Sequence, residues 1–255
     1  MSRDTSSPFF VGYLPIPPRL RGFLLLACGA FISVFVAAAV LIGGTQDAPP
    51  PSGFRFDYGR QTVTGVVELT PYPLLRVTQG NDLIQPGKTL MLTGTGKNGV
   101  IDRARDLDGQ LATVSGVILQ RGTMDMMQLR GGQNGLRAAQ GDAPELETQQ
   151  LGRWVLAGEI CDGKCLYGAM RPGRGLAHKA CANLCLLGDI PPVFVSAQPV
   201  EGADFMLITG PDGTLLPASA YDYIGQYVTL EGDLERRGDI LVLRMMPATL
   251  ERIGG

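Results

Sequence analysis

Histidine is almost missing from this sequence. The 255 residues include one, His178, and its nearest reactive neighbours in the chain are cysteines. A hydrolase of the Ser-His-Asp type would have to build its triad on this residue, so the composition argues against hydrolase chemistry. The motif C-x-x-C-H is absent as well, which excludes covalent attachment of a c-type haem.

Charge is also scarce. Charged residues make up 18% of the chain, the net charge is −2 and the pI is about 5.5, so a nucleic-acid partner is not expected. Gly87-Lys88-Thr89 ends like a phosphate-binding loop, but Asp82 stands where that motif needs its first glycine. Glycine (35) and proline (18) are abundant instead, which favours many short strands and turns.

One long segment has no charge at all. Between Gly22 and Gln46 the run FLLLACGAFISVFVAAAVLI is almost wholly apolar. About 20 such residues span the hydrocarbon core of a bilayer, and only a helix satisfies its own backbone there. We predict an uncleaved transmembrane helix; the alternative is a secretory signal, whose apolar region is shorter, about 7–15 residues.

Arginines predict the orientation of this helix. Arg3, Arg19 and Arg21 precede it, against the single acidic residue Asp4. The positive-inside tendency keeps such a segment in the cytoplasm and sends the rest of the chain across. In a bacterium this predicts an inner-membrane protein whose C-terminal part lies in the periplasm, where disulfides can form.

An internal repeat follows the apolar run. GQLATVSGVILQRG from Gly109 matches GQYVTLEGDLERRG from Gly225, 116 residues later. Nearer the N-terminus, the match between Gly65 and Gly158 has an offset of only 93 residues. The second copy therefore carries about 23 extra residues, and these contain the cysteines and the histidine.

We interpret the repeat as two small β domains, each with a mid-strand glycine, Gly116 and Gly232, that suits a bulge or a sharp coil. Small five-stranded barrels use such glycines to close. The fold class is therefore mainly β: an N-terminal transmembrane helix followed by two tandem β-barrels like the oligonucleotide/oligosaccharide-binding (OB) fold, the second with a short Cys/His helical insertion. An open sandwich is the alternative.

The predicted organisation is a cytoplasmic segment 1–21, a transmembrane helix 22–44, a proline-rich linker 45–53, a first β domain 54–130, a linker 131–150 and a second β domain 151–255 with its insertion at 161–192.

Methionines occupy matching places in the two copies. Copper sites of the periplasm use methionine, but alternating methionines on a strand are more typical of a barrel core. We therefore assign to the core Met124, Met126, Met127, Met245 and Met246.

The insertion gathers the reactive side chains. Its spacing is Cys161-x3-Cys165-x12-His178-x2-Cys181-x3-Cys185. The composition predicts a short helix over 177–187, with Gly188 at its C-terminal end. On such a helix His178, Cys181 and Cys185 share one face. The loop Pro172-Gly173-Arg174-Gly175 can fold Cys165 back onto that face.

Three uses of this cluster stay open. One imidazole and several thiols form a donor set for zinc or copper(I), with Cys165, His178, Cys181 and Cys185 as ligands and Cys161 as a fifth cysteine or a substitute. Alternatively, four cysteines in an oxidising compartment form two disulfides and no cofactor is bound. Thiol-disulfide redox chemistry is the third use; Lys164 and Lys179 flank the thiols and would favour thiolates, although solvated lysines are the simpler expectation.

The stretch from Gly158 to Pro192 and the strands ending at Leu243 resemble small secreted or membrane-anchored bacterial proteins of undefined role. In those proteins a C…H-x2-C-x3-C segment, followed by glycine and proline, interrupts a small OB-like β domain. The resemblance implies an extracytoplasmic domain and a metal. The matching positions are Cys165, His178, Cys181 and Cys185. Cys161 departs from the pattern.

The donor atoms are also similar to those of Sco-type copper chaperones, which are anchored by one helix and use C-x3-C with a distant histidine. Here His178 precedes the pair Cys181 and Cys185, and no thioredoxin-like βαβ pattern surrounds them. The sequence thus favours a non-enzymatic, membrane-anchored periplasmic protein that binds zinc or copper(I), for structure or for delivery to a membrane partner. The alternatives are a disulfide-stabilised interaction module of a membrane complex and, third, a thiol-disulfide redox protein.

Overall fold

The computed structural model describes residues 16–45 and 52–254, with the backbone alone for Thr45. The chain divides into two compact units, Met1–Pro49 and Pro50–Gly255. In the first unit, α1 (Pro18–Thr45) starts four residues before the predicted helix and is long and apolar enough to cross a membrane, since an 18-residue window within it has a mean hydropathy of 2.7. Arg3, Asp4 and most of the predicted linker (46–51) lie outside the described residues.

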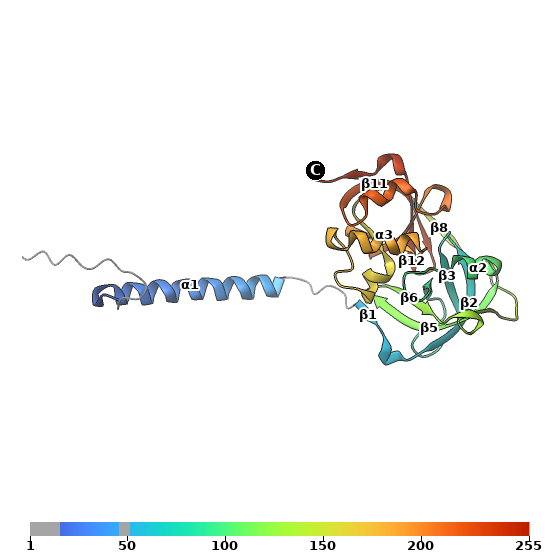
Figure 1. Ribbon diagram of the computed structural model, residues 1–255, viewed down its shortest axis with the longest axis horizontal. Helices are drawn as coiled ribbons and strands as arrows, with labels where there is room; N and C mark the ends of the chain where they lie inside the picture. Colours follow the sequence, from blue (N-terminus) through green and yellow to red (C-terminus); the bar gives the residue numbers. More distant parts are fainter. Residues whose placement is uncertain (1–15, 46–51, 255) are drawn as a thin grey trace, which may run out of the picture. The chain divides into compact units, whose positions relative to one another are not determined.

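The second unit is built from strands with few helices (Figure 1). Its strands and α-helices are β1 (Ser52–Phe54), β2 (Gln61–Leu69), β3 (Pro73–Gln79), β4 (Thr89–Thr93), α2 (Ile101–Ala104), β5 (Leu111–Arg121), β6 (Met124–Leu129), β7 (Leu136–Ala138), β8 (Thr148–Asp162), α3 (Lys179–Leu187), β9 (Pro192–Val200), β10 (Ala203–Thr209), β11 (Tyr227–Arg237), β12 (Ile240–Met245) and β13 (Glu251–Arg252).

Two closed five-stranded barrels share one topology. In the first, the strand order β5-β2-β3-β4-β6 closes through pairing of β6 with β5, and the β4–β6 pair is parallel. In the second, β11-β8-β9-β10-β12 closes through β12 and β11, and the β10–β12 pair is parallel. This order is that of the OB fold. The predicted barrels are confirmed, and an open sandwich is wrong because both sheets close.

The predicted domain limits differ from the observed strands by a few residues. Ser52 and Gly53, predicted as linker, pair with the end of β5. β8 begins at Thr148, so the second barrel starts three residues before the predicted limit. Inside the predicted linker 131–150, β7 pairs with β5. These short extensions satisfy backbone groups along strands that would otherwise be left as open edges.

The mid-strand glycines allow close crossing of strands. Gly116 pairs with Leu129 in regular register, without a bulge. A Cβ atom on Gly116 would lie 2.2 Å from the carbonyl oxygen of Gln128, and one on Gly232 would lie 2.7 Å from that of Arg244. Glycine is therefore required at both places for a steric reason: the partner backbone occupies the place of a side chain.

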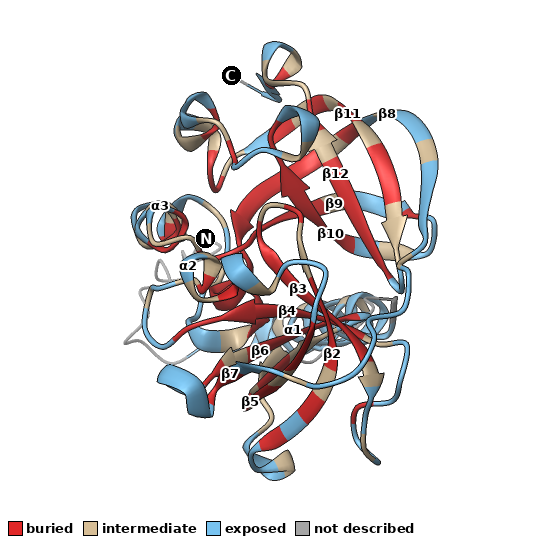
Figure 2. Cartoon of the chain, turned by 90° about the vertical axis from the view of Figure 1, so that its right-hand side faces the viewer, coloured by how far each residue is buried: buried red, intermediate tan, exposed pale blue. Residues whose placement is uncertain are grey.

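Buried residues run along the strands of both barrels (Figure 2). Each barrel has its own apolar core, and a third core lies between them, where Leu119 and Met126 of the first barrel join Cys161, Phe205 and Val242 of the second. The assignment of methionines to the core is confirmed for Met124, Met126, Met127 and Met245, whereas Met246 is partly exposed. The two predicted domains thus form one unit, because each barrel covers apolar surface of the other.

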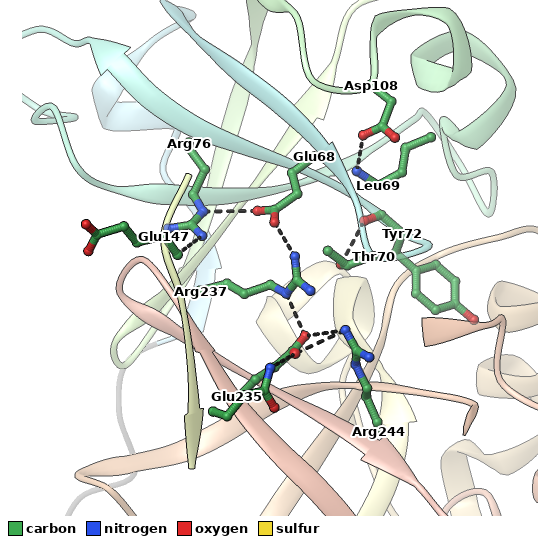
Figure 3. Close-up of polar contacts among 11 residues, drawn as sticks. Glu68, Leu69, Thr70, Tyr72, Arg76, Asp108, Glu147, Glu235, Arg237 and Arg244 are labelled. Atoms are coloured by element: carbon green, nitrogen blue, oxygen red, sulfur yellow. Dashed lines mark hydrogen bonds and ion pairs between the residues drawn. The ribbon is translucent and has the colours of Figure 1, made fainter. Parts of the chain in front are cut away.

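A chain of alternating charges also joins the barrels (Figure 3). Glu68 on β2 accepts from Arg76, at 3.1 Å, and from Arg237 on β11. Arg237 also binds Glu235 at 2.6 Å, and Arg244 on β12 binds the same carboxylate at 3.0 Å. The Glu235 side chain is only 1% exposed, and its ion pairs with these arginines compensate the cost of burying a carboxylate.

Candidate metal centre

The insertion leaves the second barrel between its first two strands, as predicted. β8 ends at Asp162 and β9 begins at Pro192, and the base of the insertion is closed where the Gly163 N–H donates to the Pro191 carbonyl at 2.9 Å. Cys165 opens a short helical turn, Cys165–Ala169. The loop folds back onto this turn, since a Cβ on Gly173 would lie 2.3 Å from the Cys165 carbonyl oxygen.

The second half of the insertion is α3, preceded by a 3-10 turn, Leu176–His178. Alanines and leucines favour the helix, and Cys185 lies on its buried side. Gly188 caps the C-terminus as predicted: its N–H bonds to the carbonyls of Cys185 and Leu186. Its φ of −94° suits any residue; glycine is needed because a Cβ would lie 1.9 Å from the carbonyl oxygen of Lys97.

The fold brings the predicted donors together in two overlapping groups. Ligand atoms of Cys165, His178 and Cys181 all lie within 4.8 Å of one another, and so do those of Asp162, Cys165 and Cys185. Cys165 belongs to both groups. All of these side chains are buried except Cys181, which is partly exposed. Such an arrangement is compact enough to ligate a single metal ion.

Cys161 lies elsewhere. It is fully buried in the core between the barrels, where its thiol donates to the Val193 carbonyl at 3.7 Å. Burial raises the pKa of this thiol well above its usual range. The residue belongs to neither donor group, because alternation along β8 turns its side chain toward the neighbouring barrel.

Asp162 is a member of the site that the sequence analysis missed. One carboxylate oxygen accepts the backbone N–H of Cys165 at 2.8 Å, and the other lies 2.8 Å from His178 Nε2. Its side chain has no exposed surface. A carboxylate on one ring nitrogen fixes the orientation of a histidine and leaves the other nitrogen as the donor, the arrangement usual for histidines that bind metals.

Lys97 is the second missed member, and it comes from the other barrel. It lies between β4 and α2, and its ammonium donates to Cys181 Sγ at 2.7 Å and to Cys185 Sγ at 3.4 Å. The hydrogen bond to Cys181 outweighs desolvation and raises the pKa of Lys97. Lys97 is therefore positively charged and lies beside the thiols of Cys181 and Cys185.

The loop that carries Lys97 is fixed to the insertion at several points. Lys164, predicted to be solvated, is 4% exposed, and its ammonium donates to the carbonyls of Gly94 and Gly96, both at 2.7 Å. Burial lowers its pKa. The Gly99 N–H donates to the Gly188 carbonyl at 2.5 Å. The expectation of a solvated side chain was wrong for Lys164, because the first barrel covers the residue. Lys179, the other lysine that flanks the thiols, donates from its ammonium to the Asp222 carbonyl.

The thiols form an asymmetric pair. Cys165 and Cys185 sulfurs lie 4.0 Å apart, which is hydrogen-bonding distance and well beyond the roughly 2.05 Å of a disulfide. The hydrogen bond from Cys165, together with Lys97, lowers the pKa of Cys185 to about 7 against desolvation and the Asp162 charge. The same hydrogen bond raises the pKa of Cys165. All five cysteines, Cys28 among them, are free thiols in this structure.

A pocket of about 270 Å³ opens beside the thiols. Cys165, Cys185, Lys97 and Lys164 line it, together with Met170. The Cys181 thiol donates to Met170 Sδ at 3.4 Å, and Met170 is 45% exposed. The donor cluster is therefore connected to solvent through a thioether.

Asp162, Lys97 and Met170 belong to the site although the sequence analysis did not name them. They differ in how far the sequence indicates them. Asp162 adjoins Cys161, and Met170 lies between Cys165 and His178, so both are near the motif. Lys97 is 84 residues from Cys181 and carries no sequence signal. No family model matches the chain, and neither the curated proteins nor the solved structures include one significantly similar to it.

Proposed function

We propose that this chain is a membrane-anchored bacterial protein whose periplasmic barrels carry a site for zinc or copper(I), structural or for delivery of the metal to a membrane partner. The observation that carries the proposal is the convergence of Cys165, His178 and Cys181 donor atoms within 4.8 Å of one another. Imidazole and thiolate are the ligands that zinc and copper(I) share.

Three further features support a metal. All of the donors except Cys181 are buried, which shields a bound ion from water, and Asp162 orients His178 as carboxylates do in metal sites. The ammonium of Lys97 stands beside Cys181 and Cys185, where it offsets the negative charge of a complex with several thiolates. The resemblance to anchored bacterial proteins with a C…H-x2-C-x3-C segment is part of the same proposal.

The experiment is a joint count of metal and thiols on the full-length chain. The protein is purified anaerobically in detergent, and bound metal and free thiols are measured on the same sample. We expect one equivalent of zinc or copper in the wild type and its loss in His178→Ala. Cys161→Ala is the matched control, because Cys161 lies in the other core, and it keeps the metal. A wild type without metal contradicts the proposal.

Anchoring and orientation need a separate test. α1 satisfies the length and hydropathy of a membrane span, and a signal sequence satisfies them too. The mass of the membrane-extracted protein distinguishes an uncleaved chain from a processed one. Alkaline phosphatase fused after Gly255 is active only in the periplasm. Processing near residue 44, or an inactive fusion, contradicts this part of the proposal.

One observation favours a second candidate, a disulfide-stabilised or redox-active module. Cys165 and Cys185 are close, and their hydrogen bond leaves one of them ionised near neutral pH. A thiolate is the species that attacks the disulfide of a partner molecule in thiol-disulfide exchange, and the neighbouring thiol then displaces the reduced partner. Loss of two thiols without bound metal, with Cys165 and Cys185 joined in one peptide, is the outcome that selects this candidate over a metal site.

A further inference from the structure

Resting on the proposed metal site, we infer that its ion is copper(I), and that Met170 is the outermost donor, through which the ion enters and leaves. Met170 belongs to no part of the predicted site. Its sulfur lies 3.4 Å from Cys181 Sγ, so the two sulfurs can contact one ion together.

The donors that remain available are soft. Both oxygens of the Asp162 carboxylate are already engaged, by the Cys165 N–H and by the His178 ring, so this residue has a supporting role. Three thiols, one imidazole nitrogen and one thioether are left. Zinc takes thiolates, imidazoles and carboxylates, whereas a thioether is a ligand that selects copper(I).

The number of donors points the same way. Structural zinc sites use four ligands around a tetrahedron. Here the third thiol, Cys185, is grouped with Asp162 and Cys165 and not with His178 and Cys181, so three soft donors lie within 4.8 Å of one another. Copper(I) is satisfied by two or three soft ligands, so Cys165, His178 and Cys181 suffice for it.

Charge reduces the advantage of a divalent ion. Lys97 and Lys164 both line the pocket beside the thiols. Each ammonium offsets one negative charge of a site with several thiolates, and the attraction of the site for a cation scales with the charge that remains. A monovalent ion loses less from this than zinc does.

Exposure changes stepwise along the donors. Met170 is 45% exposed, Cys181 is partly exposed, and Cys165, Cys185 and His178 are 5%, 2% and 2% exposed. An ion arriving from solvent therefore meets the thioether first, then Cys181, then the buried donors. Ligand exchange along this series lets another soft-donor protein take the ion without opening the barrel.

The test compares two ions on full-length, reduced protein in detergent under anaerobic conditions. Copper(I) affinity is measured by competition with bathocuproine disulfonate and zinc affinity by competition with 4-(2-pyridylazo)resorcinol. Met170→Leu keeps the size of the side chain and removes the sulfur. Met246→Leu, which changes a methionine that follows β12 and does not line the pocket, is the matched control.

We expect Met170→Leu to weaken copper(I) binding roughly tenfold and to speed copper(I) loss to the chelator, with zinc affinity unchanged. Met246→Leu leaves both affinities at the wild-type value. Equal copper(I) affinity in the wild type and Met170→Leu overturns the role of Met170. A wild type that holds zinc but not copper(I) overturns the choice of ion while the proposed function stands; binding of neither ion overturns both.

Discussion

Lys97 of the first barrel donates a hydrogen bond of 2.7 Å to Cys181 of the second. This contact makes the site a joint product of two barrels, because the donors come from the insertion and the neighbouring cation comes from the loop after β4. Lys164 forms the reciprocal link, from the insertion back to the Gly94 and Gly96 carbonyls. Chemistry at the thiols therefore depends on contact between the barrels.

Replacing Lys97 changes thiol ionisation in the metal-free protein. The pKa of Cys185 is about 7, and Lys97 is one of the groups that lower it. A lowered thiol pKa means that the thiolate is present above pH 7 and is lost as the pH falls through that value. In Lys97→Gln the midpoint rises, and at pH 7 the thiolate fraction falls roughly threefold. Thiolate absorbance at 240 nm against pH measures this.

Lys97→Arg is the control for that experiment, since it keeps the charge and the donors, and Cys185→Ala identifies the titration step. A midpoint that stays near 7 in Lys97→Gln would assign the whole effect to the hydrogen bond from Cys165, which is the larger cause of the shift.

The loop that carries Lys97 is held by close backbone packing. A Cβ on Gly99 would lie 2.0 Å from the Asp189 carbonyl oxygen, whereas one on Gly131 meets nothing within 4 Å. We expect Gly99→Ala to lower the free energy of unfolding by about 2 kcal/mol and to displace the loop from the insertion. We expect Gly131→Ala to change the free energy of unfolding by less than about 0.5 kcal/mol. Urea unfolding followed by fluorescence of Trp154, the single tryptophan, compares them.

Equal midpoints for Gly99→Ala and Gly131→Ala would show that the loop yields without cost. In that case Lys97 would be free to leave the thiols, and the contact between the barrels would not control the site.

Arg237 connects two carboxylates, the buried Glu235 and the partly buried Glu68. Removing one partner of a buried ion pair typically costs about 3–5 kcal/mol, and here the loss is expected at the low end because Arg76 still pairs with Glu68 and Arg244 with Glu235. Because the Arg237 side chain is 15% exposed, we expect Arg237→Met to lower the free energy of unfolding by about 3 kcal/mol. Arg105→Met, which removes an exposed ion pair with Asp102, should cost less than about 1 kcal/mol. Similar urea midpoints for the two variants would contradict this role of Arg237.

Glu235 makes the same region sensitive to acid. Burial opposes its ionisation, but hydrogen bonds from Arg237 and Gln150 outweigh burial, and the net pKa is lowered. A carboxylate with a lowered pKa stabilises the fold above its ordinary pKa, and this contribution is lost as the pH falls through the lower, folded value. We expect the urea midpoint of the wild type to decrease as the pH falls below about 4.5. In Glu235→Gln the urea midpoint should decrease less steeply over the same range. Parallel pH profiles for the two proteins would rule this out.

Much of this molecule follows from its sequence alone. Twenty-odd uncharged apolar residues specify α1, and the 116-residue offset between Gly109 and Gly225 predicts two barrels of the same kind. The helical spacing of His178, Cys181 and Cys185 predicts their shared face. These features are local or periodic, and such patterns are set by backbone geometry that neighbouring residues impose on one another.

Contacts between distant segments were decided by the tertiary structure. Nothing near Cys161 indicates that it turns toward the core between the barrels, and nothing near Lys97 indicates that it meets Cys181. Both follow from how one closed barrel packs on the other, which buries apolar surface and brings a loop of the first against the insertion of the second. The sequence determined which atoms are available to bind an ion; the packing of the barrels decided which of them meet, and which cation lies beside them.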